Sequence, residues 1–424
     1  MAVRNVNVSK ASASGYYEEE TKVRRASLSV SYKGDKLDKE ISSQATSFTY
    51  TDNASGESDS FSSTIVNASK NWINKWFPTK GDTITPSVTL KNWLKQNTVA
   101  TMKCGSFVID DLSFAGRPLI FTLSGVSIPA NENFKNTKKN NTYEDVTIKE
   151  IASKIAKSAG ITLYYDAPSI KIDEIEQSEQ PDSTFLSSLC DTYGLAMKVY
   201  NNKLVIFDEA TYEAKDTVAT IDETDMEDWS YNSTIDGSYT GAKVSYTIPD
   251  TEKTVTKTVG KAGRMYETSL QVSSEYDAEL KAAAIVNKAN KKITTMTVKI
   301  MANPKIVATS TVQITGLGKL NGKYYVDQVK HSLGSGYTMT LTLHLIQTRI
   351  GSTVSTAKSS NGNYTVKSGD NLWMLAKQFY GSGTKMNVIY EANKEVIEAT
   401  AKAHGFSSSQ NGHWIWPGTK LVIP

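Results

Sequence analysis

Hydrophobic residues between positions 148 and 159 recur with the period of an α-helix. They are Ile148, Ile151, Ala152, Ile155, Ala156 and Ala159, which form one helical face. Thr147 and Glu150 have the spacing of a capping box, and Gly160 follows the last apolar position. The pattern predicts an amphipathic helix between Thr147 and Gly160, followed at once by a strand over residues 161–165.

A second apolar stripe predicts a helix with its cap near Asp182 or Ser183 and its end at Gly194. The stripe consists of Phe185, Leu186, Leu189, Cys190 and Tyr193. A strand over residues 195–200, an Asn-Asn turn and a returning strand over residues 203–207 follow. We therefore expect residues 147–207 to form a small α+β subdomain.

The region before this subdomain shows shorter stretches of β-forming residues between turn residues. Strands are expected at 26–32, 41–50, 107–114 and 119–128. The segment from Lys70 to Phe77 is interpreted as either a short helix or a loop with exposed aromatic side chains. We interpret this region as a barrel-like β domain.

Residues 240–350 return to strands, with one helix expected from about Glu275 to Asn290 behind a Ser274 cap. A Leu-Asn-Gly turn ending at Gly322 precedes a strand at 324–333. The stretch from Tyr337 to Ile346 alternates strictly, with Met339, Leu341, Leu343 and Leu345 on one face and Thr338, Thr340, Thr342 and His344 on the other. Alternation of this kind gives one dry and one wet face, so His344 is expected to be solvated.

Residues 351–363 are rich in Ser, Thr, Gly and Asn, which is typical of a linker. Beyond them, residues 364–367 predict a strand, Asp370 a helix cap, and residues 420–423 a closing strand. Two helical stripes lie between, so a βααβ module is expected. The whole chain then divides into a first β domain at 1–140, an α+β insert at 141–235, a second β domain at 236–350, a linker at 351–363 and the module at 364–424.

Composition and charge argue against several classes of protein. The net charge of +3 over 424 residues gives no global field for a specific nucleic-acid partner. Two cysteines and four scattered histidines provide neither a disulfide framework nor a metal site, and nothing indicates a cofactor. Residues 1–15 lack the core of a secretory signal, and no apolar run is long enough for a membrane anchor. We expect a protein made in the cytoplasm.

The acidic residues are locally concentrated, at 166–182 and at 213–228. The simplest interpretation of both runs is a solvated acidic face.

The C-terminal module resembles the LysM family. The matching segments are YTVKSGDNLWMLAKQFYG at 364–381, Asn393 near the end of the second stripe, and IWPGTKLVIP at 415–424. The resemblance implies binding of N-acetylglucosamine-containing glycans such as peptidoglycan in a shallow groove between two turns. On this sequence the implied glycan-binding residues are Gly369, Asp370, Asn371 and Leu372 on one side and Ile415, Trp416, Pro417 and Gly418 on the other, together with Asn393.

This module departs from the family pattern in one segment. Residues 394–414 stand where typical members have only a few residues, and we expect them to add a third helix at 394–404, ended by Gly405. Because the insertion borders the implied groove, two roles stay open: glycan binding, or docking of the module to a neighbouring protein. Trp414 and Trp416 are correspondingly either groove or core residues.

Residues 20–350 are similar to the late-control protein D family of phage tail hubs. The matching segments are GSFVIDDLSF at 105–114, DVTIKEIASKIAKSAGITLYYD at 145–166, QSEQPDSTFLSSLCDTYGLAMKVYNNKLVIF at 177–207 and LNGKYYVDQVKHSLGSGYTMTLTLHL at 320–345. The resemblance implies a mainly β fold with two tail-tube-like β-barrel domains and a small α+β insert. It further implies a bacterial homotrimer that joins a hexameric tail tube protein to a separate spike protein among other baseplate proteins.

The implied function is that of a structural baseplate hub in a contractile phage tail or a phage-tail-like bacteriocin. In such a ring the acidic runs would face the channel or the baseplate. Two other functions are weighed, a peptidoglycan hydrolase and a stand-alone glycan-binding protein. No residue set at catalytic spacing supports the hydrolase, so no catalytic residue is assigned.

Overall fold

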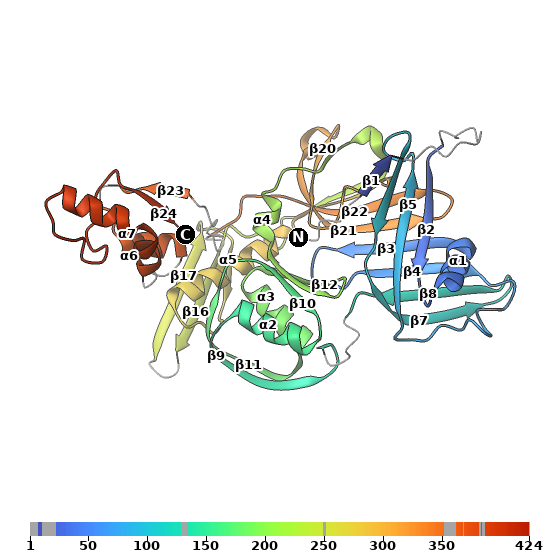
Figure 1. Cartoon of the computed structure of the whole chain (residues 1–424), viewed down its shortest axis with the longest axis horizontal. Helices are drawn as coiled ribbons and strands as arrows, with labels where there is room; N and C mark the ends of the chain where they lie inside the picture. The colour runs from blue at the N-terminus through green and yellow to red at the C-terminus, as the bar shows by residue number, and fades with distance from the viewer. Residues whose placement is uncertain are drawn as a thin grey trace. The chain divides into compact units, whose positions relative to one another are not determined.

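The computed structural model of the chain describes residues 7–10, 23–128, 134–248, 252–351, 362–367, 369–380, 383 and 386–423. The chain divides into two compact units, Met1–Thr353 and Val354–Pro424 (Figure 1). Most of the expected linker, residues 352–361, lies outside the described residues. The predicted mainly β fold with an α+β insert and a terminal βααβ module is confirmed.

The first part of the chain forms two layers of strands that cross each other (Figure 1). One layer holds β2, β5, β6 and β1, and the other runs β7-β8-β4-β3. Strand β5 joins them, because its first residues pair with β7 and the following ones with β2. The elements are β1 (Asn7–Lys10), β2 (Arg25–Ser31), α1 (Asp35–Gln44), β3 (Ala45–Asn53), β4 (Ser60–Val66), β5 (Thr83–Lys91), β6 (Thr98–Lys103), β7 (Phe107–Ala115) and β8 (Ile120–Val126).

The second β region continues the same sheet, because β21 pairs with β3 from Gln328 opposite Asn53 to Leu333 opposite Phe48. From β21 the order runs β22-β19-β15, and β20 joins β21 to β14. One hydrophobic core underlies both regions. The elements are β14 (Ala219–Asp222), β15 (Met226–Ser233), β19 (Thr294–Met301), β20 (Thr311–Thr315), β21 (Gly322–Leu333) and β22 (Tyr337–Leu345).

Strands β14 and β15 differ from the expected segmentation, which grouped residues up to 235 with the α+β insert. They pair with β20 and β19, respectively. Their partner strands follow much later in the sequence, and β15 is mostly exposed. No local apolar pattern could therefore assign these strands to the second β region.

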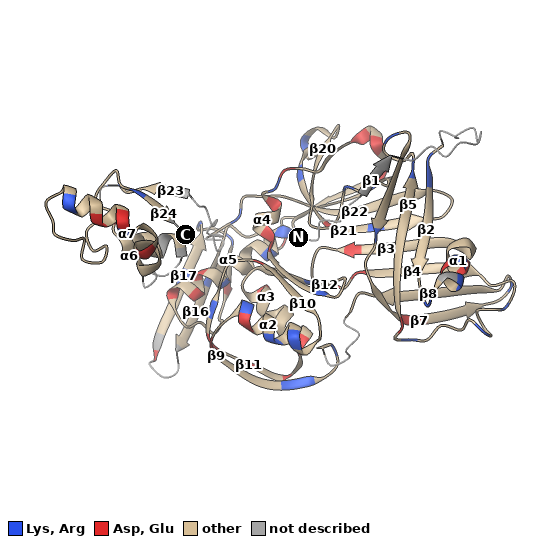
Figure 2. Ribbon diagram, in the orientation of Figure 1, with Lys and Arg blue, Asp and Glu red and all other residues tan. Residues whose placement is uncertain are grey.

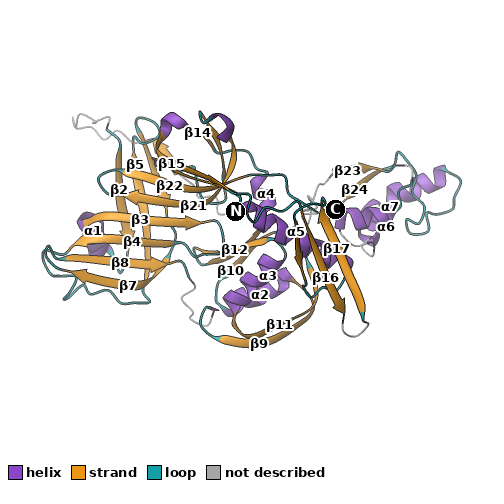
Figure 3. Ribbon diagram, turned by 180° about the vertical axis from the view of Figure 1, so that it is seen from behind, coloured by secondary structure: helices purple, strands orange, loops and turns teal. Residues whose placement is uncertain are grey.

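The α+β insert has a two-stranded ribbon, and α2 and α3 lie on the concave side of its curve (Figure 3). The capping box is present, since Thr147 Oγ1 accepts the Glu150 N–H at 3.2 Å and the Glu150 carboxylate accepts the Thr147 N–H at 2.8 Å. The cap expected near Asp182 or Ser183 lies one residue earlier, at Pro181, and Asp182 is the first residue of the helix, where it accepts from Lys139. The elements are β9 (Lys138–Thr147), α2 (Ile148–Ser158), β10 (Thr162–Asp166), β11 (Lys171–Pro181), α3 (Asp182–Thr192), β12 (Leu195–Tyr200), β13 (Lys203–Asp208) and α4 (Glu209–Glu213).

A separate small sheet packs on a long helix within the second β region of the sequence. The sheet is β17-β16-β18, and helix α5 covers it. The predicted cap is confirmed, because Ser274 Oγ accepts the Asp277 N–H at 3.1 Å. The elements are β16 (Gly241–Ile248), β17 (Lys253–Gly260), β18 (Met265–Thr268) and α5 (Glu275–Lys291).

In the part of the second unit that the structure describes, a two-stranded antiparallel sheet lies with two α-helices. The expected third helix at 394–404 is wrong, because the second helix runs through this segment without a break. Its buried stripe continues from Ile389 through Asn393 to Ile397 and Ala401, so no residue interrupts the helical period. The elements are β23 (Gly362–Thr365), α6 (Leu372–Tyr380), α7 (Met386–Ala403) and β24 (Lys420–Ile423).

Two expectations for the first β region need correction. The strand expected at 41–50 begins only at Ala45, because Leu37 and Ile41 lie four residues apart on the inner face of α1. The segment 70–77 is a series of turns, and Phe77 is exposed as predicted. Trp72, however, is fully buried: its ring stacks on Phe121, and its indole N–H donates to Gln44 Oε1 at 3.0 Å.

A buried lysine fastens the insert to the first β region. The Lys198 ammonium, on β12, lies 3.1 Å from Asp52 Oδ1 and 3.0 Å from Asp59 Oδ1, and it also donates to the Asn53 carbonyl. The second oxygen of Asp52 accepts the Ala308 N–H at 3.1 Å. Burial alone would lower the pKa of Lys198, but the two carboxylates raise it above its usual value. One ion cluster thus connects three distant segments of the chain.

None of the helices in the described ranges is both long and apolar enough to cross a bilayer. Within the same ranges, no group of three or more His, Cys, Asp or Glu side chains is placed to hold a metal ion.

Replacing Lys198 with Met should strongly destabilise the first unit. The change leaves two carboxylates buried without their cation, which costs roughly 3–5 kcal/mol when one partner of a buried pair is removed. Scanning calorimetry of the full chain should show a clearly lower unfolding temperature for Lys198→Met. Lys203→Met, on the exposed end of the neighbouring strand β13, is the matched control and should melt like the wild type. Equal melting of both variants would contradict the proposed fastening.

Candidate functional site

Side chains hold the described residues of the first expected groove turn, 367 and 369–372, in place. Asp370 accepts the Lys367 N–H and the Tyr364 hydroxyl, both at 2.7 Å. Asp370 was expected to cap the following helix, but Asn371 does so, because its Oδ1 accepts the Met374 N–H at 2.8 Å. Asp370 thus closes the turn, and the hydrogen bond that it accepts raises the pKa of Tyr364.

The second expected groove turn, at residues 415–419, is fixed to the first through Val366. The Gly418 N–H donates to the Val366 carbonyl at 2.8 Å, and the Val366 N–H donates to the Thr419 carbonyl at 2.9 Å. Gly418 has a φ of 90°, which favours glycine at this position. The two turns that the sequence assigned to one groove are therefore brought together.

The side chains of the expected groove differ in their accessibility. Gly369, Asn371, Pro417 and Gly418 are exposed, and Asp370, Ile415 and Trp416 are partly buried. Leu372 is fully buried and belongs to the core of the module. Leu372 therefore supports the first turn from inside.

Asn393 also lies in the interior of the module. Its Oδ1 accepts the Val422 N–H at 2.6 Å, and its amide group donates to the Val422 and Ile389 carbonyls. Both ends of the side chain are thus engaged by β24 and by its own helix. We conclude that Asn393 fastens α7 to the edge of the two-stranded sheet.

The inserted segment reaches Trp416, one of the expected groove residues. The His404 ring stacks on the Trp416 ring, with centroids 4.8 Å apart and planes 17° apart. Trp416 is consequently shared between the expected groove and the insertion.

A second polar cluster lies in the first unit, where β21, β22, α4 and α5 meet. His344 Nδ1 lies 2.7 Å from Asp327, and its Nε2 lies 3.2 Å from Glu213. His344 was expected to be solvated, and this is wrong: only 2% of it is exposed. Helices α4 and α5 cover this end of β22, and Glu213 stands 131 positions away in sequence. The alternating pattern of β22 could not predict that residues so distant in sequence would bury His344.

Two cations complete this cluster. Arg349 binds Glu213 with two hydrogen bonds, of 3.0 and 2.7 Å. Lys291 lies 2.7 Å from Glu209 and 2.9 Å from Asp327. The charged residues of α4 are acidic, and α5 carries charged residues of both signs (Figure 2). Burial would lower the pKa of Lys291, but the two carboxylates raise it.

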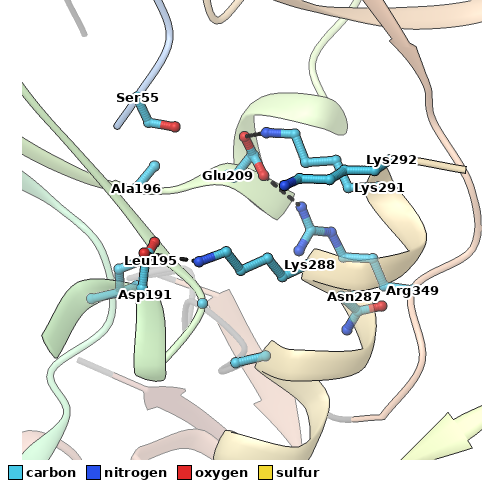
Figure 4. A pocket seen from close by; sticks show the side chains of 12 residues that line it. Ser55, Asp191, Leu195, Ala196, Glu209, Asn287, Lys288, Lys291, Lys292 and Arg349 are labelled. Carbon is cyan, nitrogen blue, oxygen red and sulfur yellow. Dashed lines mark hydrogen bonds and ion pairs between the residues drawn. The ribbon is translucent and has the colours of Figure 1, made fainter. Parts of the chain in front are cut away.

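A pocket of about 140 Å³ opens beside these pairs, and charged side chains line it (Figure 4). Lys288 pairs with Asp191 at 2.8 Å, and Arg349 lies 3.7 Å from Glu209. Two carboxylates of the lining, Asp191 and Glu209, are thus paired with cations across the pocket, and the lining as a whole carries more Lys and Arg than Asp and Glu. This arrangement is typical of a structural junction between α3, α4, α5 and the chain that follows β22.

The expected solvated acidic faces are largely present. Asp173, Glu174 and Glu176 on β11 are exposed, as are Glu227 and Asp228 on β15. Two residues are exceptions: Asp182 is buried and accepts from Lys139, and Glu213 is enclosed by the guanidinium of Arg349 and the imidazole of His344.

Comparison with known proteins assigns the chain to a family. Residues 133–344, which are half of the chain, match the family described as YQBQ-like. The chain belongs to the YQBQ-like family. Residues 364–400 match the LysM domain. The LysM match lies inside the second unit.

Two individual proteins are similar to parts of this chain. A probable baseplate hub protein of Escherichia phage 186 is 31% identical over 116 residues, which are 27% of this chain and 29% of that protein. The uncharacterized protein YqbP of Bacillus subtilis is 47% identical over 68 residues, which are 16% of this chain and 30% of YqbP. The YQBQ-like chain thus spans under a third of the length of these two relatives.

The fold of the YQBQ-like chain resembles that of a tail protein from Neisseria meningitidis MC58. The TM-score is 0.59 at 12% identity, and the match covers 75% of this chain and 96% of that chain. Together these matches confirm the resemblance to phage tail baseplate proteins with a C-terminal LysM module that the sequence motifs predicted.

The stability of the first unit should fall as pH rises through the titration of His344. Burial lowers the pKa of His344, but hydrogen bonds to Asp327 and Glu213 raise it to about 8. Because the folded value exceeds the unfolded value of roughly 6.5, protonated His344 contributes about 2 kcal/mol that is fully present below pH 6.5 and lost as pH rises through 8. We expect the difference in melting temperature between wild type and His344→Gln to shrink from pH 6 to pH 9. The exposed His413→Gln serves as control and should follow the wild type at every pH.

Asn393→Ala should destabilise the LysM unit. The change leaves the Val422 N–H and carbonyl without their partner, which costs roughly 1–3 kcal/mol. Limited proteolysis should cleave this unit faster in Asn393→Ala, while Glu395→Ala, on the exposed face of the same helix, should leave the rate unchanged. A resistant Asn393→Ala unit would refute the fastening role.

Proposed function

We propose that this YQBQ-like chain is a structural, non-enzymatic baseplate hub protein of a contractile phage tail or a phage-tail-like bacteriocin. In this role three copies form a ring that joins a hexameric tail tube protein to a separate spike protein, in contact with other baseplate proteins. Family membership carries the proposal, together with the 31% identity over 116 residues to the probable baseplate hub protein of phage 186.

The internal contacts of the first unit support a role as a rigid adaptor. The two β regions share one sheet through β3 and β21, and the insert is fastened by Lys198 and by the cluster around Glu213. Buried ion pairs and a shared sheet resist relative motion of the segments that they join. An adaptor between two parts of a tail requires such rigidity.

The exposed edge of the large sheet supports self-association. Strand β15 ends the sheet, pairs only with β19 among the described strands, and is exposed along most of its length. Trp229 on this strand is 38% exposed. A long edge strand with an exposed aromatic residue favours pairing with another chain, so we propose that β15 contributes to the contact between copies.

The LysM unit supplies the contact with the cell wall in this proposal. Its two turns meet at Val366 with backbone groups and Trp416 at the surface, which suits a shallow site for peptidoglycan. Docking to other baseplate proteins is the second role for the same unit.

Sedimentation of the purified full chain should give a mass three times the 46.5 kDa of one copy. Trp229→Glu should shift the population toward single chains, because it places a charge on the proposed contact. Tyr276→Glu changes a similarly exposed aromatic on α5 and should leave the trimer intact.

Two outcomes would count against the proposed function. One is a wild-type chain that sediments as a single copy at micromolar concentration. The other is a fall in turbidity when the chain is incubated with purified cell walls, which would indicate a hydrolase.

A further inference from the structure

The loop between β4 and β5 combines exposed apolar side chains with positive charge. Phe77 is 55% and Ile73 41% exposed. Residues 67–81 include neither Asp nor Glu but three lysines, all of them exposed. These are Lys70, Lys75 and Lys80. We call residues 67–81 the basic loop.

Aromatic rings hold the basic loop against the sheet. The fully buried Trp72 ring meets the Trp76 ring edge-on, with centroids 5.4 Å apart. The Phe77 ring stacks on Phe114 of β7 at a centroid distance of 5.8 Å. The Trp72 backbone N–H also donates to Asn67 Oδ1 at 3.2 Å. The loop is therefore fixed beside β7, and presenting its exposed side chains to a partner costs little conformational entropy.

The far end of the same sheet is acidic. From β7 the strand order runs through β8, β4, β3, β21, β22 and β19 to β15 (Figure 3). The 3₁₀-helix η2 (Glu223–Asp225) and the start of β15 carry most of the charge. Residues 222–229 include no Lys or Arg but five carboxylates, which are Asp222, Glu223, Asp225, Glu227 and Asp228. We call residues 222–229 the acidic edge.

The acidic edge keeps most of its charge and also offers an apolar contact. Lys299 pairs with Glu227 at 2.8 Å. Glu223 and Asp228 are exposed and form no ion pair with the residues that the structure describes. Trp229, which is 38% exposed, follows them on β15. The basic loop and the acidic edge thus have opposite charges and an exposed aromatic ring each, which is the composition expected of two surfaces that bind each other.

A ring of three copies requires two different contact surfaces on each copy. A surface that pairs with itself closes a two-fold dimer, whereas a three-fold ring joins one surface to a different surface of the next copy. The basic loop and the acidic edge meet this requirement, because they lie beside β7 and at β15, far apart in one sheet. Residues 257–264 carry three cations as well, but their one large apolar side chain, Val259, is buried.

We propose that the basic loop of one copy contacts the acidic edge of the next copy in the ring. Lys75 and Lys80 then face the carboxylates of the neighbouring copy, and Phe77 covers the exposed edge of its β15. The inference rests on the proposed trimer and identifies the two surfaces that meet. The acidic run at 222–228 consequently faces a neighbouring copy rather than the channel.

Sedimentation equilibrium of the full chain tests this contact by charge reversal. Lys75→Glu together with Lys80→Glu should raise the concentration at which half of the trimer dissociates by roughly tenfold or more, because like charges then face each other. Glu223→Lys together with Asp228→Lys should weaken the trimer similarly. A chain with all four changes should recover most of the wild-type assembly, since the two surfaces are again of opposite charge.

A second pair of exposed lysines, outside both surfaces, provides the matched control. Lys203→Glu together with Lys261→Glu changes the net charge by the same amount as the reversal of the basic loop. This chain should assemble like the wild type. Circular dichroism of each variant shows whether the chain remains folded.

The possible results separate this contact from the trimer itself. If the wild type is a trimer and the folded chain with the reversed basic loop assembles equally well, the loop lies outside the contact and the inference is wrong, while the proposed trimer stands. The same conclusion follows if the four changes together assemble no better than either pair, or if the control pair weakens the trimer as strongly as the loop pair. If the wild type sediments as a single copy, both proposals fail.

Discussion

The ammonium of Lys198 imposes the strongest constraint on the first unit. A buried cation is tolerated only when carboxylates and carbonyls surround it, and here they come from Asp52, Asp59 and Asn53. Those residues lie where β3 passes into the turn before β4, whereas Lys198 lies on β12 of the insert. The insert can therefore pack against the sheet and exclude water only in the orientation that brings Lys198 to this turn. Asp52 also accepts the Ala308 N–H, so the same cluster positions the chain between β19 and β20.

Local patterns predicted those parts of the fold whose partners lie near in sequence. The helix at 148–158 and its capping box, the hairpin of β12 and β13, and the Ser274 cap all follow from residues within a few positions of one another. His344 shows where this reasoning ends. Its strand alternates as expected, but α4 and α5 cover the face that alternation alone would leave to solvent. The pairing of β15 with β19 likewise depends on a tertiary contact that no local pattern encodes.

The LysM unit divides the expected groove residues into two groups. Asp370, Asn371, Leu372 and Asn393 hold the frame, through turn closure, helix capping, core packing and attachment of β24. Pro417, Gly418 and part of Trp416 remain at the surface. Sequence motifs identified both groups together, because residues that build a turn and residues that present its surface occupy the same short stretch. The end of the helical segment at Gly405 was predicted, whereas the unbroken run of α7 into the insertion and the contact of His404 with Trp416 were not.

Glu213 couples the protonation of His344 to the point where the chain leaves the first unit. Its carboxylate accepts from His344 on one side and from Arg349 on the other. Next to Arg349, the Ile350 N–H and carbonyl are both bound by the Asn287 side chain, at 2.8 Å each. Proton loss from His344 removes one of the two cationic partners that hold Glu213 buried, so Arg349 must then neutralise that carboxylate alone. Arg349 and Ile350, where the chain leaves the first unit, are therefore held next to the same charged residues that stabilise the meeting point of β21, β22, α4 and α5. A change in the charge of His344 affects both.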